Sequence, residues 1–150
     1  MAAPHHPAPN AVSDQEARER VLVLHARMEK ELAHALRRRH GIGLSEHRAL
    51  ELLAHSDDGE LRMQEPADRI GLGQSSVTRP VARLEAAGFA FEDLCPSDGR
   101  GVYAVLTEEG RSRCEAARAT YAEALSSAPD SFAADPAHAP TAQALRAAGS

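Results

Sequence analysis

Residues 61–106 constrain the fold of this 150-residue chain more than any other stretch. They contain two amphipathic segments separated by Gly71-Leu72-Gly73, and then two strand-like segments around Ser97-Asp98-Gly99-Arg100-Gly101. A glycine turn between amphipathic helices is typical of a helix-turn-helix, and a glycine-containing turn between apolar runs predicts a β-hairpin. The sequence therefore predicts a mainly α protein with a winged helix, an α+β unit in which a hairpin, the wing, follows the second helix of the motif.

Caps and turn residues predict the elements of this unit. Ser45 is expected to cap a helix that ends near His55, and Ser56-Asp57-Asp58-Gly59 to form a turn. Next come a strand, a short helix, a longer helix ended by Gly88 and the paired strands of the hairpin. Their expected ranges are 61–63, 64–70, 74–87, 89–94 and 102–106.

Long amphipathic helices are predicted on both sides of the winged unit. Ser13 or Asp14 can cap the first, which runs to about Arg39, and Thr107 can cap the other. Pro129 and Pro136 are expected to bracket a loop, after which a last helix opens at 140–141 and ends near 148. Apolar side chains recur every three or four residues in both long helices: Val21, Leu24, Met28, Leu32 and Ala35, then Cys114, Ala117, Tyr121 and Leu125.

These two apolar stripes predict a homodimer. A winged unit already closes its own small core, so the stripes are expected to lack a partner within the chain and to pack against a second copy around a two-fold axis. The alternative is that they fold back on the winged unit. The expected organisation is a disordered tail (1–12), an N-terminal dimerisation helix (13–40), the winged helix-turn-helix (45–106) and C-terminal dimerisation helices (107–150).

Composition restricts the class of protein. The net charge of −5 argues against a generally basic coat for nucleic acid, although a local patch can still bind DNA. No apolar run is long enough to cross a bilayer, so no membrane partner is expected. Two cysteines suit a reducing cytoplasm and are too few for a disulfide framework. No catalytic or phosphate-binding motif is present in the sequence. We therefore expect that the protein is not an enzyme and that it binds no cofactor.

The helix predicted over 74–87 has two chemically different faces. Val77, Val81 and Leu84 fall on one side and are expected to pack inward. Polar side chains occupy the other side and the N-terminal end: Gln74, Ser75, Ser76, Thr78, Arg79 and Arg83. A recognition helix enters the major groove with its N-terminal end, where small hydroxyl groups allow close approach and an arginine can reach a guanine edge. The alternative is structural: the serines satisfy first-turn N–H groups, and Arg83 pairs with a nearby acid.

The tip of the predicted hairpin carries a second candidate contact. Arg100 can enter a narrowed minor groove, where the negative potential is high. Asp98, two residues earlier, can pair with Arg100 or stabilise the turn.

These motifs are similar to those of the MarR family of transcriptional regulators. The resemblance covers roughly residues 14–148 and is strongest over 61–110. The residues that carry it are Leu61-Arg62-Met63, Ala67-Asp68-Arg69-Ile70-Gly71-Leu72, Gln74-Ser75-Ser76-Val77-Thr78-Arg79, Leu84-Glu85-Ala86-Ala87-Gly88, Asp98-Gly99-Arg100 and Leu106-Thr107-Glu108-Glu109-Gly110.

The resemblance implies a homodimer that binds a pseudo-palindromic double-stranded DNA operator, usually as a repressor relieved by a small-molecule effector. By the same resemblance, bases or phosphates face Gln74, Ser75, Ser76, Thr78 and Arg79, and the minor groove receives Arg100. The effector of such a protein binds between the dimer helices and the winged domain. Here that cleft would be lined by parts of the first two predicted helices and by the penultimate one.

Several residues depart from the family pattern. Pro80 stands inside the recognition helix, where an unaccommodated proline costs ~3 kcal/mol, and Gly73 replaces the usual capping serine. Acids at 92 and 93 precede the wing, and residues 61–106 hold five arginines against six acids, a net charge of −1. These features favour an alternative, a dimeric helical interaction module whose winged domain binds protein. Arg79 and Arg100 favour DNA.

The histidines and cysteines of the chain suggest two further alternatives, metal sensing and redox sensing. Five histidines occur on the predicted helices, at 25, 34, 40, 47 and 55, and none stands four residues from another. Solvated or groove-lining histidines are therefore expected, and no metal site. Cys95 lies at the base of the wing, and Cys114 is expected to be a small buried apolar residue.

Overall fold

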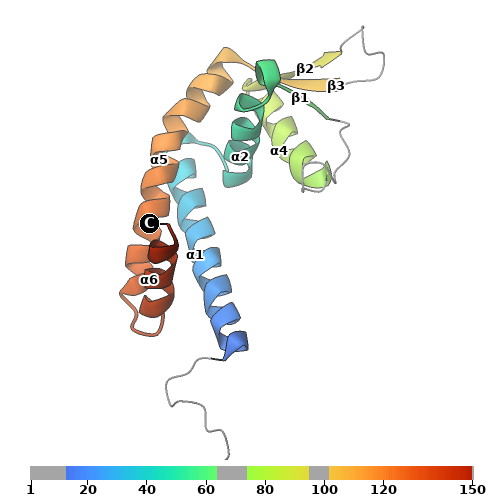
Figure 1. Ribbon diagram of the computed structural model, residues 1–150. Coiled ribbons are helices and arrows are strands. Elements are labelled where there is room, and N and C mark those ends of the chain that lie inside the picture. Colours follow the sequence, from blue (N-terminus) through green and yellow to red (C-terminus); the bar gives the residue numbers. More distant parts are fainter. Residues whose placement is uncertain (1–12, 64–73, 95–101, 150) are drawn as a thin grey trace, which may run out of the picture. The chain divides into compact units, whose positions relative to one another are not determined.

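The computed structural model describes residues 13–63, 74–94 and 102–149, with backbone only for 74–76 (Figure 1). Its elements are α1 (Asp14–His40), α2 (Leu44–Ala54), the 3-10 helix η1 (Asp57–Gly59), β1 (Glu60–Arg62), α4 (Gln74–Ala86), β2 (Ala90–Leu94), β3 (Val102–Leu106), α5 (Glu108–Ala133) and α6 (Ala139–Ala148). This mainly helical fold with a small sheet confirms the predicted fold class. The short helix predicted over 64–70 and the tail predicted over 1–12 lie outside the described residues.

The chain forms two compact units. One runs from Glu31 to Ala124 and contains the sheet; the other combines the described residues up to Lys30 with those from Leu125 onward. The helices α1 and α5 each contribute to both units, because the division falls within them.

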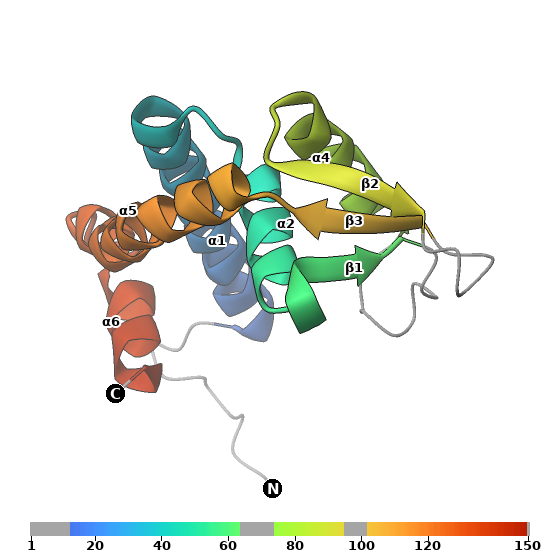
Figure 2. The ribbon, with the colours of Figure 1, turned by 90° about the horizontal axis from the view of Figure 1, so that it is seen from above.

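The sheet of the larger unit is antiparallel, with strand order β1-β3-β2. Figure 2 shows β3 between the other two strands. In the hairpin Ala90 pairs with Leu106 and Leu94 with Val102, so the predicted hairpin strands are confirmed to within one residue. This pairing places Ala90, Ala104 and Leu106 in the core, where they meet the helices.

The core of the larger unit lies between the sheet and helices α2, α4 and α5. Leu50 and Leu53 of α2 are fully buried in it. The predicted inward face of α4 is confirmed, because Val77, Val81 and Leu84 are all buried there. Since α2 packs directly on α4, the position of α4 depends on the apolar face of α2.

Two of the predicted helix caps are confirmed and one is wrong. The hydroxyl of Ser13 accepts the N–H of Glu16 at 3.2 Å, and that of Thr107 accepts the N–H of Gly110 at 3.0 Å. Ser45 caps nothing: α2 begins one residue earlier, with Gly43 at the cap position. The reason is that the extended backbone before Leu44 places Ile42 in the core, where it is 4% exposed.

The loop predicted to open at Pro129 is also wrong, because α5 continues through this proline to Ala133. An interior proline removes one helical hydrogen bond and costs ~3 kcal/mol where nothing compensates. Ala128 and Phe132 are both fully buried on either side of Pro129, and their packing holds the last turns of α5 together.

Most residues of the apolar stripes have partners within the chain, contrary to the expectation from sequence, whereas Val21 and Leu125 of these stripes stay exposed. Leu24 of α1 packs against Phe132 of α5 and Ala142 of α6 in the helical unit. Cys114 and Ala117 of α5 belong to the core of the larger unit. Packing of each helix against its neighbours thus buries most of the two stripes within the chain.

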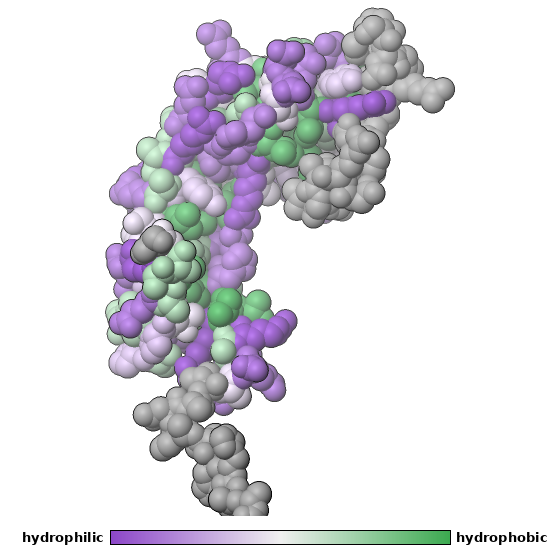
Figure 3. All heavy atoms as spheres, viewed as in Figure 1, coloured by the Kyte–Doolittle hydropathy of each residue, from purple (hydrophilic) through white to green (hydrophobic). Residues whose placement is uncertain are grey.

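Two stripe residues and three other apolar side chains stay exposed in the helical unit: Val21 and Leu125, with Leu22, Val23 and Leu145. Figure 3 shows an apolar area over the lower part of α1, beyond a largely hydrophilic stretch of the same helix. None of the described helices has the length and apolar content that crossing a membrane requires.

Candidate nucleic-acid interface and ligand cavity

The exposed face of α4 is the first candidate site. Thr78, Arg79, Ala82, Arg83 and Ala86 are exposed and recur at helical spacing, on the side away from the core. The two alanines keep this face shallow between the long side chains. A shallow helix face flanked by arginines can lie close to a surface rich in acceptor oxygens, such as a DNA groove.

The structure brings three of the predicted DNA-binding residues together on this face: Thr78, Arg79 and Arg83. The side chains of Gln74, Ser75 and Ser76, and all of Asp98 and Arg100, lie outside the described residues. Within the part of the chain that the structure describes, neither Arg79 nor Arg83 forms an ion pair. Both arginine side chains are exposed on this face.

Pro80 does not interrupt α4. The helix is continuous from Gln74 to Ala86, and Pro80 is buried between the inward-facing Val77 and Val81. The ring thus occupies the side of α4 that faces the core, and leaves the exposed face unobstructed.

The acids near the wing lie toward the C-terminal end of α4. Glu85 is half-buried, and burial together with the nearby charge of Glu92 raises the pKa of its carboxyl group. Seven residues of helix separate Glu85 from Thr78, about 10 Å along the axis. The negative charge is therefore displaced from the N-terminal end of α4, where a recognition helix approaches DNA most closely.

A second candidate site is a cavity between α2 and α5. Its volume is about 390 Å³, and it is lined by His47, Arg48, Glu51, Arg118 and Tyr121. Three of these residues come from α2 and two from α5. Charged and aromatic side chains thus converge on one space, as in sites that bind small molecules.

Glu51 is the centre of this cluster. Its Oε1 accepts hydrogen bonds from the Nε of Arg118 at 2.7 Å and from the Sγ of Cys114 at 3.1 Å. Its Oε2 lies 3.4 Å from the Nδ1 of His55. Burial alone would raise the pKa of Glu51, but the hydrogen bonds from Arg118 and Cys114 outweigh burial and hold that pKa below its ordinary value.

His47 forms the buried wall of the cavity. It is 3% exposed, and its ring stacks on Tyr121 with centroids 5.2 Å apart and an interplanar angle of 29°. Burial lowers the pKa of His47 below its ordinary value, so the ring is neutral at pH 7. The wall is therefore flat, largely apolar and uncharged.

Cys114 is held as a thiol. Burial, and then the hydrogen bond to Glu51, raise its pKa to about 12. Because the thiolate is the reactive form, Cys114 is not suited to redox sensing near neutral pH. Cys95 lies outside the described residues.

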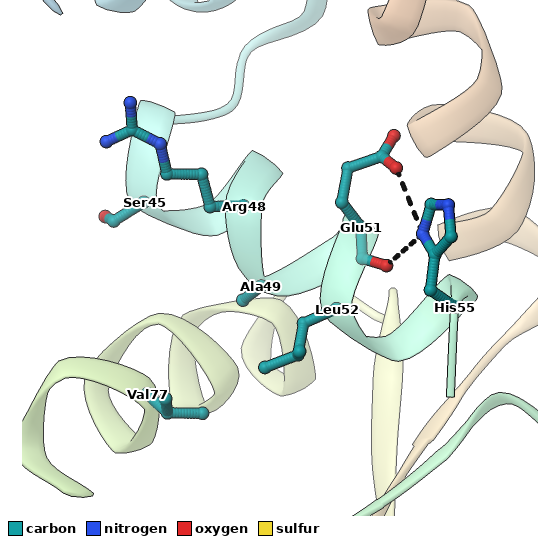
Figure 4. A pocket seen from close by; sticks show the side chains of 7 residues that line it. All are labelled: Ser45, Arg48, Ala49, Glu51, Leu52, His55 and Val77. Atoms are coloured by element: carbon teal, nitrogen blue, oxygen red, sulfur yellow. Dashed lines mark hydrogen bonds and ion pairs between the residues drawn. The ribbon is translucent and has the colours of Figure 1, made fainter. Parts of the chain in front are cut away.

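Another cavity, of about 500 Å³, lies between α2 and α4. Figure 4 shows that Ala49 and Leu52 of α2 point toward Val77 of α4, whereas Arg48 and Glu51 point away from α4. His55 accompanies Glu51, since its Nδ1 lies 2.7 Å from the backbone oxygen of Glu51. The apolar groups of this cavity belong to the packing of α2 on α4, and we place the candidate ligand site in the α2–α5 cavity.

Sequence reasoning missed the central part of the α2–α5 cavity. Glu51 and Arg118 are 67 residues apart, and no local pattern pairs them. One signal was present: His47, Glu51 and His55 recur every four residues and so share one side of α2. Among the described residues no group of three His, Cys, Asp or Glu side chains is arranged to hold a metal ion.

Comparison with known proteins agrees with this geometry. Residues 40–101 match the model of the MarR family. The HTH-type transcriptional regulator MhqR of Bacillus subtilis (strain 168) is 36% identical over 72 residues, which is 48% of this chain and 48% of that protein. The chain spans about half the length of the curated relatives it matches.

The fold extends the likeness over almost the whole chain. The MarR family regulator Sco3205 of Streptomyces coelicolor, solved in complex with DNA, has a TM-score of 0.69 and 26% identity over 94% of this chain and 90% of its own. CouR of Rhodococcus jostii RHA1, solved with p-coumaroyl-CoA, has a TM-score of 0.61 and 23% identity over 77% and 78%. The family model, the curated relatives and the fold all show a similarity of this chain to the MarR family.

Proposed function

We propose that this protein is a transcriptional regulator that binds a pseudo-palindromic operator as a homodimer and represses transcription until a small effector binds. The observation that carries the proposal is the exposed face of α4, on which Thr78, Arg79 and Arg83 stand opposite a fully packed apolar face. The Streptomyces relative solved with DNA supports this reading. Such a protein acts in the cytoplasm, where its operator is, and needs no catalytic group.

The exposed apolar side chains of the helical unit support the homodimer. Val21, Leu22 and Val23 are each about half exposed on α1, and Leu125 and Leu145 are exposed on α5 and α6. Removing such side chains from water stabilises association by roughly 25 cal/mol per Å² of apolar surface. A homodimer has two copies of α4, and the proposed operator would receive them in successive major grooves roughly 34 Å apart.

The α2–α5 cavity is the proposed effector site. Its lining combines a flat aromatic wall with the charged groups of Glu51 and Arg118. The relative CouR was solved with p-coumaroyl-CoA, which supports effector binding in this family. A ligand regulates DNA binding only if it favours one arrangement of the protein over another.

Fluorescence anisotropy tests the proposal, with a labelled duplex from the intergenic region beside the gene and an excess of scrambled duplex at near-physiological salt. We expect the chain to bind, and Arg79→Ala to weaken binding at least tenfold without dissociating the dimer. The control is Arg38→Ala, which removes the same charge from an exposed position on α1. Equal loss in both variants, or no loss in either, would contradict a reading role for α4.

The second part of the proposal concerns the wing and is based on the sequence: Arg100 is expected to contact the operator. Arg100→Ala is expected to weaken operator binding more than tenfold while the protein stays dimeric. Affinity unchanged by this substitution would remove the wing from the proposed contact.

The exposed acids Glu92 and Asp93 favour a second candidate function, a dimeric interaction module whose winged unit contacts protein. Reversing the charge of both Arg79 and Arg100 separates the two functions. A DNA reader loses duplex binding, whereas the interaction module has no specific duplex binding to lose.

A further inference from the structure

We propose that the open edge of β2, the side of the strand that faces away from β3, is a docking site for another protein. Its occupant is an extended basic segment that pairs with β2 as an additional strand. This inference goes beyond the proposed regulator, because it locates a protein partner on an element other than the exposed face of α4. It follows from the direction of the backbone groups of β2, from the side chains along the edge and from their charge.

The backbone of β2 has hydrogen-bonding groups that the described part of the sheet does not use. The strand order places β2 at one margin of the sheet, beside α4 (Figure 2). Val102, the cross-strand neighbour of Leu94, accepts the N–H of Met63 at the other side of β3. Residues of an antiparallel strand alternate in the side to which they direct both backbone groups. Leu94, and Glu92 two residues earlier, therefore direct their N–H and C=O groups to the open edge.

Four consecutive side chains are exposed along this edge, in the order apolar, acidic, acidic, apolar. They are Phe91, Glu92, Asp93 and Leu94, of which Phe91 is 49% and Leu94 72% exposed. Neighbouring residues of a strand point to opposite faces, so each face of the edge presents one apolar and one acidic side chain. Apolar pairs and pairs of opposite charge stabilise neighbouring strands. The matching segment therefore has the order apolar, basic, basic, apolar, which is the same in both chain directions.

The negative charge of the edge selects a basic occupant. Neither Glu92 nor Asp93 forms an ion pair within the described residues, and β2 itself contains no basic residue. Glu85 of α4 adds a third acid, and burial together with the charge of Glu92 raises the pKa of its carboxyl group. A cationic side chain near Glu85 and Glu92 relieves their repulsion, whereas a DNA phosphate increases it. The edge therefore fits a basic protein segment and does not fit DNA.

A second copy of this chain is a poorer occupant than a basic segment. If two β2 edges pair so that their apolar ends meet, Glu92 and Asp93 of the two copies lie opposite each other. Like charges directly opposite each other destabilise a strand pair. Charged side chains on an exposed edge strand thus prevent identical edges from pairing, and they leave the edge open to a segment of opposite charge.

The test titrates three peptides into the isotopically labelled full chain and follows its backbone amide NMR signals. The probe is the peptide Thr-Val-Lys-Lys-Val-Thr with both ends blocked. One comparison peptide has glutamate in place of both lysines. The other carries a methyl group on the backbone nitrogen of each lysine, which removes an N–H donor from both edges of the peptide.

We expect the probe to bind at least tenfold more tightly than either comparison peptide, with the largest signal changes at Glu92 and Leu94, whose N–H groups gain acceptors. Equal affinity of the lysine and glutamate peptides overturns the selection of a basic segment. Equal affinity of the methylated and unmethylated peptides overturns strand pairing. No signal change at millimolar probe, or changes only outside β2, overturns the docking site.

A charge reversal at the edge tests the site in the protein itself. Glu92→Lys should weaken the lysine peptide at least fivefold and tighten the glutamate peptide. The matched control is Glu115→Lys, which makes the same change of net charge at an exposed position on α5 and should leave both affinities unchanged. Circular dichroism checks that both variants keep the native fold. Affinities that are unchanged in Glu92→Lys, or that change equally in both variants, overturn the proposal.

Discussion

Arginine side chains occur both on the exposed face of α4 and in the cluster around Glu51, but their surroundings differ. On α4, Arg79 and Arg83 are exposed and have no ion pair among the described residues. Between α2 and α5, the Glu51 carboxylate is engaged by Arg118, Cys114 and His55. We propose that the first region binds an external polyanion, whereas the second links α2 to α5 through Glu51. The difference shows that the same charged group is accessible to solvent on an exposed helix face and is engaged within the chain where two helices pack.

Replacing a core residue that supports α4 should have the largest effect on stability. Because the whole unit would be destabilised, both regions would be affected together. Leu50 is fully buried on α2 and packs in the core that supports α4. Leu50→Ala should lower the free energy of unfolding by about 2–5 kcal/mol. Urea denaturation followed by circular dichroism measures this loss. Thr78→Ala, on the exposed face, is the matched control and should change stability by no more than about 0.5 kcal/mol.

Substitution on the face of α4 should affect DNA and leave folding unchanged. If Arg79 reads a base, Arg79→Ala should cost about 1–3 kcal/mol of discrimination and leave the salt dependence of binding as it was. If it contacts a phosphate, the slope of log K against log salt falls by about one. Anisotropy titrations between low and moderate salt distinguish the two contacts. A lower melting temperature in this variant would contradict a purely external role.

The pH dependence of stability tests the buried wall of the cavity. Folding lowers the pKa of His47 from 6.5, chiefly by burial, with Arg118, His40 and Arg48 adding to the shift and Glu51 opposing it. The unfolded chain therefore binds more protons, and stability falls as pH drops below about 6.5. The melting temperature should decrease between pH 7.5 and 5.5, and less so in His47→Gln. His25→Gln, at an exposed position on α1, should leave the decrease intact.

The smallest effect is expected from the Glu51 ion pair at acid pH. Its folded pKa is lowered from 4.5, so the stabilisation it provides is complete above that value and is lost as pH falls through the folded pKa. The pair is partly exposed to solvent, which limits its contribution. Melting temperatures from pH 5 to pH 3 should therefore fall slightly more in the parent chain than in Glu51→Gln. An identical slope in both proteins would show that the pair contributes nothing.

The features predicted correctly are those encoded locally. The buried face of α4 follows from the spacing of Val77, Val81 and Leu84, and the hairpin from two short strand-like segments around a turn. The caps at Ser13 and Thr107 also depend on neighbours within a few residues.

The errors and omissions arise from tertiary packing. Ser45 was a better cap by chemistry than Gly43, but burial of Ile42 sets the start of α2. Pro129 is a helix breaker by propensity, and the burial of Phe132 overrides it. The Glu51–Arg118 contact exists only after α5 has packed on α2, so the spacing of residues in the sequence cannot reveal it.

One measurement tests the assignment of α4 most directly: the change in backbone amide NMR signals of the isotopically labelled chain when operator duplex is added. The largest changes are expected at Thr78, Arg79, Ala82 and Arg83, with small changes at Glu51 and Arg118. Changes confined to Glu92 and Asp93 of β2, or absent at a duplex concentration that saturates binding, would contradict the account.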